Sequence, residues 1–279
     1  MVQHRSWPGR ALAALTLTFD DGFADTNHET CGWLAARGSA ATYFVITKYA
    51  GKHFENLQTA SWGNWQEAAS LNHEIASHGA THVPMAGLAS ELRRLIVSIY
   101  HSPNPIQLFT EFWQRFLALR RYQVVGQLKE SRGLASSEPS ISRNEIMDQI
   151  DQYSVQSYAY PAGRYNKSAQ SAVAAAGYTS ARGLEPGINN SGVNPFALRS
   201  LCLGTGNSMS HIRPWLERTL EQSGWLILTF HLVAEENQNQ YPYFCSTKEF
   251  KSIILEIEKL PIWVATQGVI ARYLWGSQT

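Results

Sequence analysis

Short apolar runs alternate with longer amphipathic segments along most of this chain. The runs have the length and the β-branched or aromatic content of buried strands, and the segments between them have helical periodicity. The expected strands are Leu15–Phe19, Ala41–Ile46, Glu74–Ser77, Tyr158–Tyr160, Tyr178–Ala181, Phe196–Cys202, Trp225–Phe230 and Ile262–Ala265. The expected helices are Thr26–Arg37, Lys167–Ala176, Ser210–Gln222 and Thr247–Leu260. This alternation predicts an α/β protein, and about seven to eight parallel strands predict a distorted TIM-like (β/α) barrel whose chemistry lies at the carboxyl ends of its strands.

The length of 279 residues suits a single barrel domain that covers residues 1–279. One stretch, at about residues 91–140, departs from the alternation. It contains a proline-rich entry, Ser102–Pro105, and an amphipathic helix expected over Phe109–Arg121. We interpret it as a helical insertion whose apolar stripe belongs to the core or to a subunit interface rather than to a ligand site.

Composition limits the classes of function. A hydrophobic fraction of 44% indicates a globular protein, and a net charge of +1 gives no field that would gather nucleic acid or an anionic membrane. No run approaches the roughly 20 apolar residues that a membrane span requires. The first residues contain no apolar core of signal-peptide length, which predicts a cytoplasmic protein, although a chain whose leader had been removed would look the same. Cys31, Cys202 and Cys245 are odd in number and far apart, so we expect reduced thiols.

Two adjacent carboxylates, Asp20 and Asp21, directly follow the expected strand Leu15–Phe19. Burying two such groups together is costly unless a cation compensates them. His78 and His82 follow another expected strand and are spaced i and i+4, so one helical turn would direct both imidazoles to one point. A carboxylate with two imidazoles predicts a metal site. Alternatively, each motif by itself also fits an ordinary turn or a solvated helix face.

Four segments together resemble a known family. In chain order they resemble the signature segments of the polysaccharide deacetylases, the carbohydrate esterases with a NodB-homology domain. The resemblance runs from about Leu15 to Leu274 and is interrupted after Glu91. The segments are Thr18–Gly22, His78-x-x-x-His82, Tyr160–Gly163 and Leu228–His231.

The resemblance implies a role for each matching residue. Asp21, His78 and His82 would bind a divalent metal, zinc first, with cobalt, nickel or iron as alternatives that suit the same ligands. Asp20 would be the general base that takes a proton from water. The backbone N–H of Ala162, in the third segment, would stabilise the oxyanion, and His231 would protonate the leaving amine.

The sequence departs from the family pattern in three places. Many members have Arg-Pro-Pro-Tyr-Gly in the third segment, with the arginine holding the base, where this chain has Ala159–Gly163. We expect Arg199 to take over that role, with Arg164 as the local competitor. The Asp-x-x-Asp-Trp pattern is missing, which leaves open what tunes His231. Gly79 replaces the usual Ser or Thr, which removes a side-chain hydrogen bond but no ligand.

We therefore predict a metal-dependent hydrolase that removes an N-acetyl group from an amino sugar or its polymer, with an N-acetylated carbohydrate as its substrate. Two alternatives stay open: a metal-dependent amidohydrolase that acts on a small non-sugar C–N bond, and a non-catalytic carbohydrate-binding relative. Trp62 and Trp65 could stack on sugar faces or pack as surface aromatics. The oligomeric state is not indicated. No metal role is assigned to the remaining histidines: His4, His28, His53, His73, His101 and His211.

Overall fold

The computed structural model describes residues 6–86 and 131–276. The expected helix Phe109–Arg121, and most of the expected insertion at about 91–140, lie outside the described residues. Helix α5 (Ser131–Gln149) overlaps the last part of that stretch and continues beyond it. Within the described residues, no helix combines the length and the apolar character needed to cross a membrane.

Eight strands form one sheet at the centre of the molecule, and the pairings described for it are parallel. The order across the sheet is β7-β6-β5-β2-β1-β9-β8, and β12 also pairs with β1. The strands are β1 (Ala13–Phe19), β2 (Thr42–Val45), β5 (Glu74–Ser77), β6 (Ser157–Ala159), β7 (Ser180–Arg182), β8 (Leu201–Cys202), β9 (Trp225–Phe230) and β12 (Ile262–Val264).

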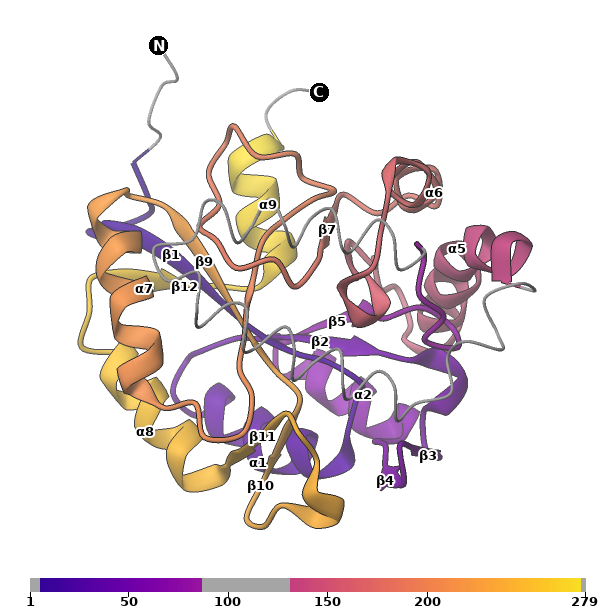
Figure 1. The fold of residues 1–279 in the computed structure, drawn as a ribbon, viewed down its shortest axis with the longest axis horizontal. Helices are drawn as coiled ribbons and strands as arrows, with labels where there is room; N and C mark the ends of the chain where they lie inside the picture. The colour runs from indigo at the N-terminus through magenta and orange to yellow at the C-terminus, as the bar shows by residue number, and fades with distance from the viewer. Residues whose placement is uncertain (1–5, 87–130, 277–279) are drawn as a thin grey trace.

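Helices surround this sheet (Figure 1). Besides α5 they are α1 (Ala24–Ala35), α2 (Trp62–Ser70), α6 (Lys167–Ala175), α7 (Met209–Glu221), α8 (Thr247–Ile257) and α9 (Gln267–Trp275). Smaller elements lie among the loops: the hairpin β3 (His53–Phe54) and β4 (Leu57–Gln58), the pair β10 (Leu232–Ala234) and β11 (Phe244–Ser246), and the single turns η1 (Thr47–Tyr49), η2 (Pro161–Gly163) and η3 (Gln238–Gln240).

The segment before and within β8 curls the sheet into a barrel. The N–H of Leu198 donates to Ala181 O at 2.9 Å, and the N–H of Gly183 donates to Leu198 O at 3.0 Å. The same segment then pairs with β9 through Leu201 and Cys202. The expected strand Phe196–Cys202 is therefore divided between the two edges of the sheet, and the expected distorted (β/α) barrel is confirmed.

The distortion has a second cause at β1. β9 pairs with nearly the whole of one edge of β1. On the other edge two strands pair with β1: β12 with Ala13–Leu15 and β2 with Thr18–Phe19. Helix α9 follows β12 and closes the amino-terminal end of the barrel. Its first turn is fixed there, because the N–H of Gly268 donates to Glu74 Oε2 at 2.9 Å.

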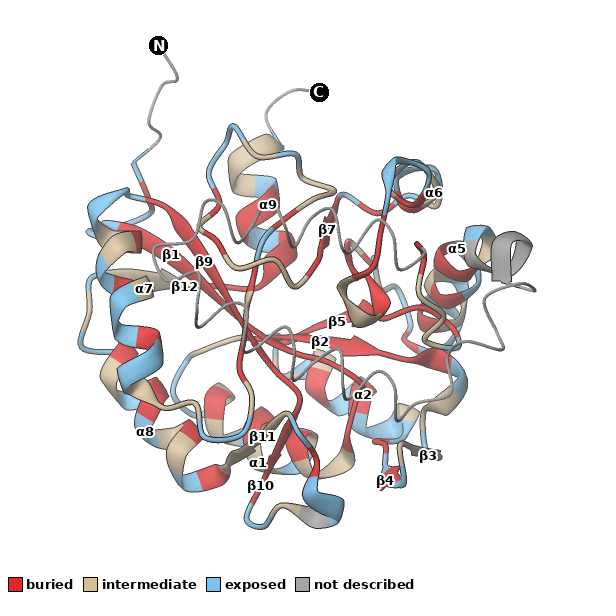
Figure 2. Ribbon diagram, viewed as in Figure 1, coloured by how far each residue is buried: buried red, intermediate tan, exposed pale blue. Residues whose placement is uncertain are grey.

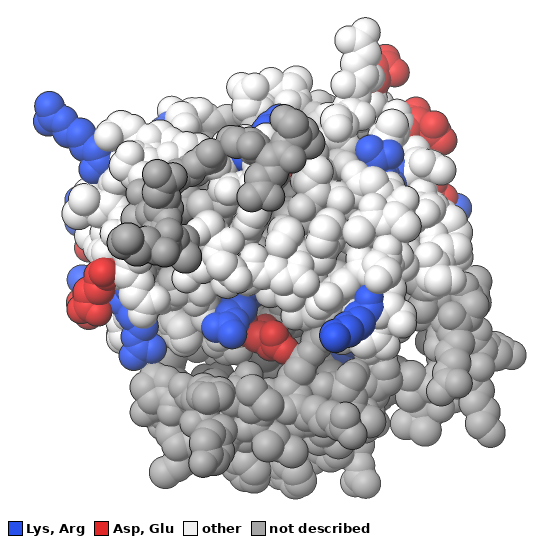
Figure 3. Space-filling model, turned by 90° about the horizontal axis from the view of Figure 1, so that it is seen from above, with Lys and Arg blue, Asp and Glu red and all other residues white. Residues whose placement is uncertain are grey.

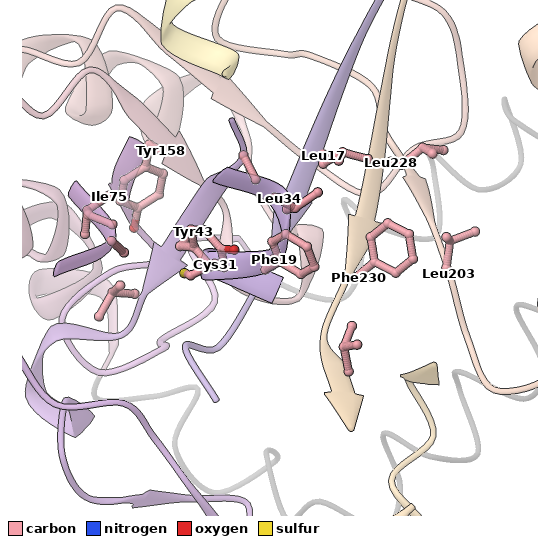
Figure 4. Packing of buried hydrophobic residues seen from close by; sticks show 14 of the residues in the cluster. Leu17, Phe19, Cys31, Leu34, Tyr43, Ile75, Tyr158, Leu203, Leu228 and Phe230 are labelled. Carbon is pink, nitrogen blue, oxygen red and sulfur yellow. The ribbon is translucent and has the colours of Figure 1, made fainter. Parts of the chain in front are cut away.

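The core lies between the central strands and the helices. All residues of β1 and β9 are buried (Figure 2), as expected for parallel strands that are covered on both faces. Phe19 stacks on Tyr43 with 4.8 Å between ring centroids and on Phe230 with 5.6 Å. Figure 4 shows these three rings together with Leu17 and Leu228. This rigid centre fixes where the end of β1 lies.

Candidate active site and metal centre

The chain turns sharply where β1 ends. The N–H of Asp20 donates to Phe230 O at 2.9 Å, which continues the ladder to β9, and Asp21 and Gly22 then adopt left-handed angles with φ +68° and +73°. A Cβ on Gly22 would lie 3.2 Å from the ring of Trp65, so the turn packs tightly. Both carboxylates are buried, at 1% and 4% exposure for Asp20 and Asp21.

The two histidines lie in a loop and not on a helix, so the expected helical turn over His78–His82 is wrong. Gly79 and His82 have φ +80° and +62°, and the chain turns sharply between the two imidazoles. This loop brings both rings to one place: Nε2 of His78 lies 3.5 Å, and Nε2 of His82 lies 3.6 Å, from Oδ1 of Asp21. The structure thus gathers the three expected ligands by a loop geometry.

The donor set fits a divalent metal. One ligand atom from each of Asp21, His78 and His82 lies within 4.8 Å of the others. Oδ1 of Asp21 is buried and has no hydrogen-bond partner among the described residues, and Oδ2 accepts from the Tyr241 hydroxyl at 3.0 Å. Nδ1 of His78 donates to the carbonyl of Ala159 at 2.9 Å, which leaves the lone pair of Nε2 directed at the site. Two imidazoles and a carboxylate suit zinc and its neighbours.

The electrostatics of the site favour the binding of a cation. Burial raises the pKa of Asp21 well above its ordinary value, and the adjacent Asp20 adds to the rise, while the Tyr241 hydrogen bond opposes it. Burial lowers the pKa of His78 and of His82 to about 3 each, which keeps both imidazoles in the neutral, metal-binding form. A buried carboxylate beside neutral imidazoles is costly until a cation compensates it.

Asp20 is held by Arg182, which is buried at 0% exposure on β7. The guanidinium contacts Oδ1 of Asp20 and lies 4.6 Å from the ring centroid of Phe44. Oδ2 of Asp20 has no hydrogen-bond partner among the described residues and faces His78 Nε2 at 3.8 Å and His231 Nε2 at 3.9 Å. One oxygen is therefore fixed, and the other is available to accept a proton.

Arg199 is not the partner of Asp20, so this expectation is corrected. It is exposed, its N–H donates to Asn189 Oδ1 at 2.9 Å, and its side chain packs against Gly187, where a Cβ would meet its Cδ at 2.3 Å. Arg182 holds the carboxylate of Asp20, which is the role that we expected of Arg199 or of its competitor Arg164. The sequence signal was present, because Arg182 directly follows the expected strand Tyr178–Ala181, and strand ends carry barrel chemistry.

His231 follows β9 and is packed by an aromatic ring. The ring of Tyr243 stacks on it with 4.7 Å between centroids and 25° between planes. Burial lowers the pKa of His231 to about 3, so the imidazole is neutral in the resting site. The segment Tyr241–Tyr243 thus supplies one phenol to Asp21 and one ring to His231. No motif in the sequence marked it.

Two further expected features are placed by the structure. Ala162 lies in η2, at the carboxyl end of β6, with φ +54°, and its role as the oxyanion donor stays a prediction. Trp65 is buried against Tyr43 and belongs to the core. Trp62 is half-buried and lines a surface groove with Thr47, Lys48, Ala50, Lys52, Glu145, Asp148 and Gln149. On the face shown in Figure 3, the described charged side chains are scattered, some of opposite sign lie side by side, and they form no extended patch of one sign.

The comparisons with known proteins agree with this site. Residues 12–111 match the family model described as polysaccharide deacetylase, and this span includes the acidic pair and both metal-site histidines. The resemblance to the polysaccharide deacetylases is thereby confirmed. No curated protein matches the chain.

Solved structures share the fold of this chain. A protein from Mycobacterium smegmatis assigned as a polysaccharide deacetylase is 13% identical, with a TM-score of 0.60 over 98% of this chain and 94% of that one. The Xyl-CE4 domain of a multidomain xylanase, from the hindgut metagenome of Trinervitermes trinervoides, is 15% identical, with a TM-score of 0.52 over 95% and 91%. The Streptococcus pyogenes deacetylase PplD, solved in complex with acetate, is 18% identical, with a TM-score of 0.50 over 74% and 69%.

Proposed function

We propose that this chain is a metal-dependent hydrolase that removes the N-acetyl group from an amino sugar or its polymer. The observation that carries the proposal is the gathering of an Asp-His-His set, an arginine-held carboxylate and a strand-end histidine at one edge of the barrel. The family match of residues 12–111 supports the same reading. The site is thus proposed for hydrolysis of an amide bond.

Asp21, His78 and His82 would hold the metal. Zinc suits the set best among the divalent ions, and cobalt, nickel or iron suit it as well. When bound, such an ion supplies Lewis-acid polarisation of the acyl oxygen and lowers the pKa of water. Tyr241 and the carbonyl of Ala159 fix the orientation of Asp21 and His78 in this role.

The other residues would move protons and hold charge. Asp20 takes a proton from water at Oδ2, while Arg182 holds Oδ1 and so orients the carboxylate. His231 Nε2 lies 3.9 Å from the same Oδ2, which gives the proton a short route toward the leaving nitrogen. The N–H of Ala162 stabilises the oxyanion that forms on the acyl group. Each step uses a group at the carboxyl ends of the strands.

An acetate-release screen tests the proposal. The protein is loaded with Zn²⁺ and given N-acetylglucosamine, chitooligosaccharides and small N-acetyl amides that contain no sugar. Acetate release from the sugars, lost in Asp20→Asn, supports the proposal. Release only from small amides would favour the non-sugar amidohydrolase, and oligosaccharide binding without release would favour a non-catalytic carbohydrate-binding protein.

A further inference from the structure

Helix α5 contacts the loops that follow two neighbouring strands of the barrel. Glu138, Ser142 and Glu145 are spaced along one face of the helix. The hydroxyl of Ser142 lies 2.6 Å from the hydroxyl of Ser77, the last residue of β5. Glu145 contacts the side chains of Thr47 and Lys48, just beyond β2. This face of α5 therefore lies against the part of the barrel that carries His78 and His82.

Glu138 contacts the metal-ligand loop itself. Its Oε2 accepts from the N–H groups of Ala80 and Thr81 at 2.7 and 2.8 Å, and its Oε1 accepts from the Thr81 hydroxyl at 2.8 Å. The side chain is buried at 3% exposure, where hydrogen bonds to a charged acceptor are strong. Ala80 and Thr81 are two of the three residues between His78 and His82, so fixing their backbone restrains the separation of the two imidazoles.

The loop needs such an acceptor because it has little regular structure of its own. It contains two left-handed residues, Gly79 and His82. Gly79, directly after the first histidine, has no side chain that could hydrogen-bond to the loop. A Cβ built there would lie 3.0 Å from Glu138 Oε2 and 3.3 Å from the Tyr158 hydroxyl, so the carboxylate occupies the space beside the glycine. The acceptor for the N–H groups of Ala80 and Thr81 is therefore supplied by another element, α5.

We propose that Glu138 is a positioning residue that holds the loop of His78 and His82 in its metal-binding shape, an inference that rests on the proposed metal-dependent function. It acts through the backbone of Ala80 and Thr81 and does not touch the metal. Partners that orient metal ligands typically contribute about 10- to 100-fold to affinity. Glu138 therefore supports the metal site from outside, through a helix that is far from His78 and His82 in the sequence.

Zn²⁺ affinity of the purified protein, measured by competition with a chromophoric chelator, tests the inference. We expect Glu138→Ala to weaken binding by about tenfold or more. We expect Glu138→Gln to keep most of the affinity, because its amide can present an oxygen to the two N–H groups and a donor to the Thr81 hydroxyl. Asp148→Asn, at an exposed carboxylate farther along α5, is the matched control and should bind as the parent does.

Several outcomes separate the explanations. Parent-like Zn²⁺ affinity in folded Glu138→Ala overturns the inference, and a lower melting temperature with unchanged affinity overturns it too, because a purely structural role predicts that result. If Glu138→Ala does not fold, Glu138→Asp decides: its carboxylate is one methylene short of the loop, so parent-like affinity again overturns the inference. Failure of the parent protein to bind Zn²⁺ would contradict the proposed function, independently of Glu138.

Discussion

Two of the three metal-site residues have a left-handed backbone. Asp21 and His82 have φ +68° and +62°, a conformation that costs a residue with a side chain about 1 kcal/mol or more. That these three residues meet at one place could be predicted, because both segments follow strands and their side chains suit a metal. The turn geometry could not, since i and i+4 spacing fits a helix and a tight loop equally well.

Arg182 shows a different limit of sequence reasoning at this scale. It pairs with Asp20 from β7, far along the chain, and the pairing depends on how the sheet curls. Of the two other candidates, Arg164 directly follows the segment Tyr160–Gly163, and Arg199 lies within the expected strand Phe196–Cys202. Residue type and spacing alone do not distinguish among the three arginines. Burial excludes only Arg199, because Arg164 is buried as Arg182 is, and it is the contact with Asp20 that identifies Arg182.

Arg182→Lys should lower turnover while the metal is retained. Lys keeps the positive charge but lacks the planar guanidinium that orients a carboxylate. The carboxylate of Asp20 should therefore no longer be held with Oδ2 directed into the site. We expect a loss of about 10- to 100-fold in kcat, measured by acetate release from the Zn²⁺ protein. Arg199→Lys, exposed and away from Asp20, should remain within about twofold of the parent. A slow Arg199 variant beside a normal Arg182 variant would restore the original expectation.

Tyr241→Phe should shift the pH dependence of Zn²⁺ binding upward. The phenol donates to Asp21 and lowers the pKa of that carboxyl group against the effect of burial. Without it the pKa of Asp21 rises further, and protons compete with the metal up to a higher pH. Zn²⁺ affinity measured from pH 5 to 8 checks this. An unchanged midpoint would show that the hydrogen bond does not tune Asp21.

At the scale of elements, local patterns predicted the long strands and helices well. β1, β9 and α8 lie within a few residues of their expected ranges, because their apolar periodicity is strong. The helices α2 and α9 were not predicted. Both begin at a capping residue, Ser61 and Thr266, whose side chain accepts from the first turn. Capping signals therefore held information that the apolar pattern lacked.

The buried side chain of Glu74 accepts a hydrogen bond from the first turn of α9, so a substitution there tests how this helix is held against the barrel. Burial raises the pKa of this carboxyl group, although hydrogen bonds from Gly268, Ser157 and Thr42 oppose the rise. Because its folded pKa lies above the unfolded value near 4.5, its stabilising contribution is present below that pH and is lost as pH rises through the folded pKa. Glu74→Gln should therefore raise the melting temperature at pH 7, by about 2–4 °C per kcal/mol gained.

The gain in Glu74→Gln should shrink as pH falls toward 4.5, where the parent carboxyl group is itself protonated. Thermal unfolding followed by circular dichroism across this range measures it. A variant that is less stable at pH 7 would indicate that the amino terminus of α9 stabilises an ionised Glu74 more than burial penalises it.

At the scale of the whole molecule, the site exists because the sheet is parallel and curled. Asp20 follows β1, His78 follows β5, Ala162 follows β6, and His231 follows β9, so strand ends far apart in the sequence meet at one edge. Alternation along the chain was enough to predict this gathering. The division of Phe196–Cys202 between two sheet edges was not predictable, because it depends on contacts across the whole barrel.

Metal binding should therefore stabilise the whole protein and not only the loop. A ligand that binds only the folded state adds about 2.7 kcal/mol at one hundred times its dissociation constant. Zn²⁺ should raise the melting temperature, a chelator should reverse the rise, and a His78→Ala plus His82→Ala variant should not respond. The rise should diminish as pH falls, because protons compete at Asp21, whose pKa is raised by burial. An equal response of the parent and the double variant to Zn²⁺ would place the metal outside the site of Asp21, His78 and His82.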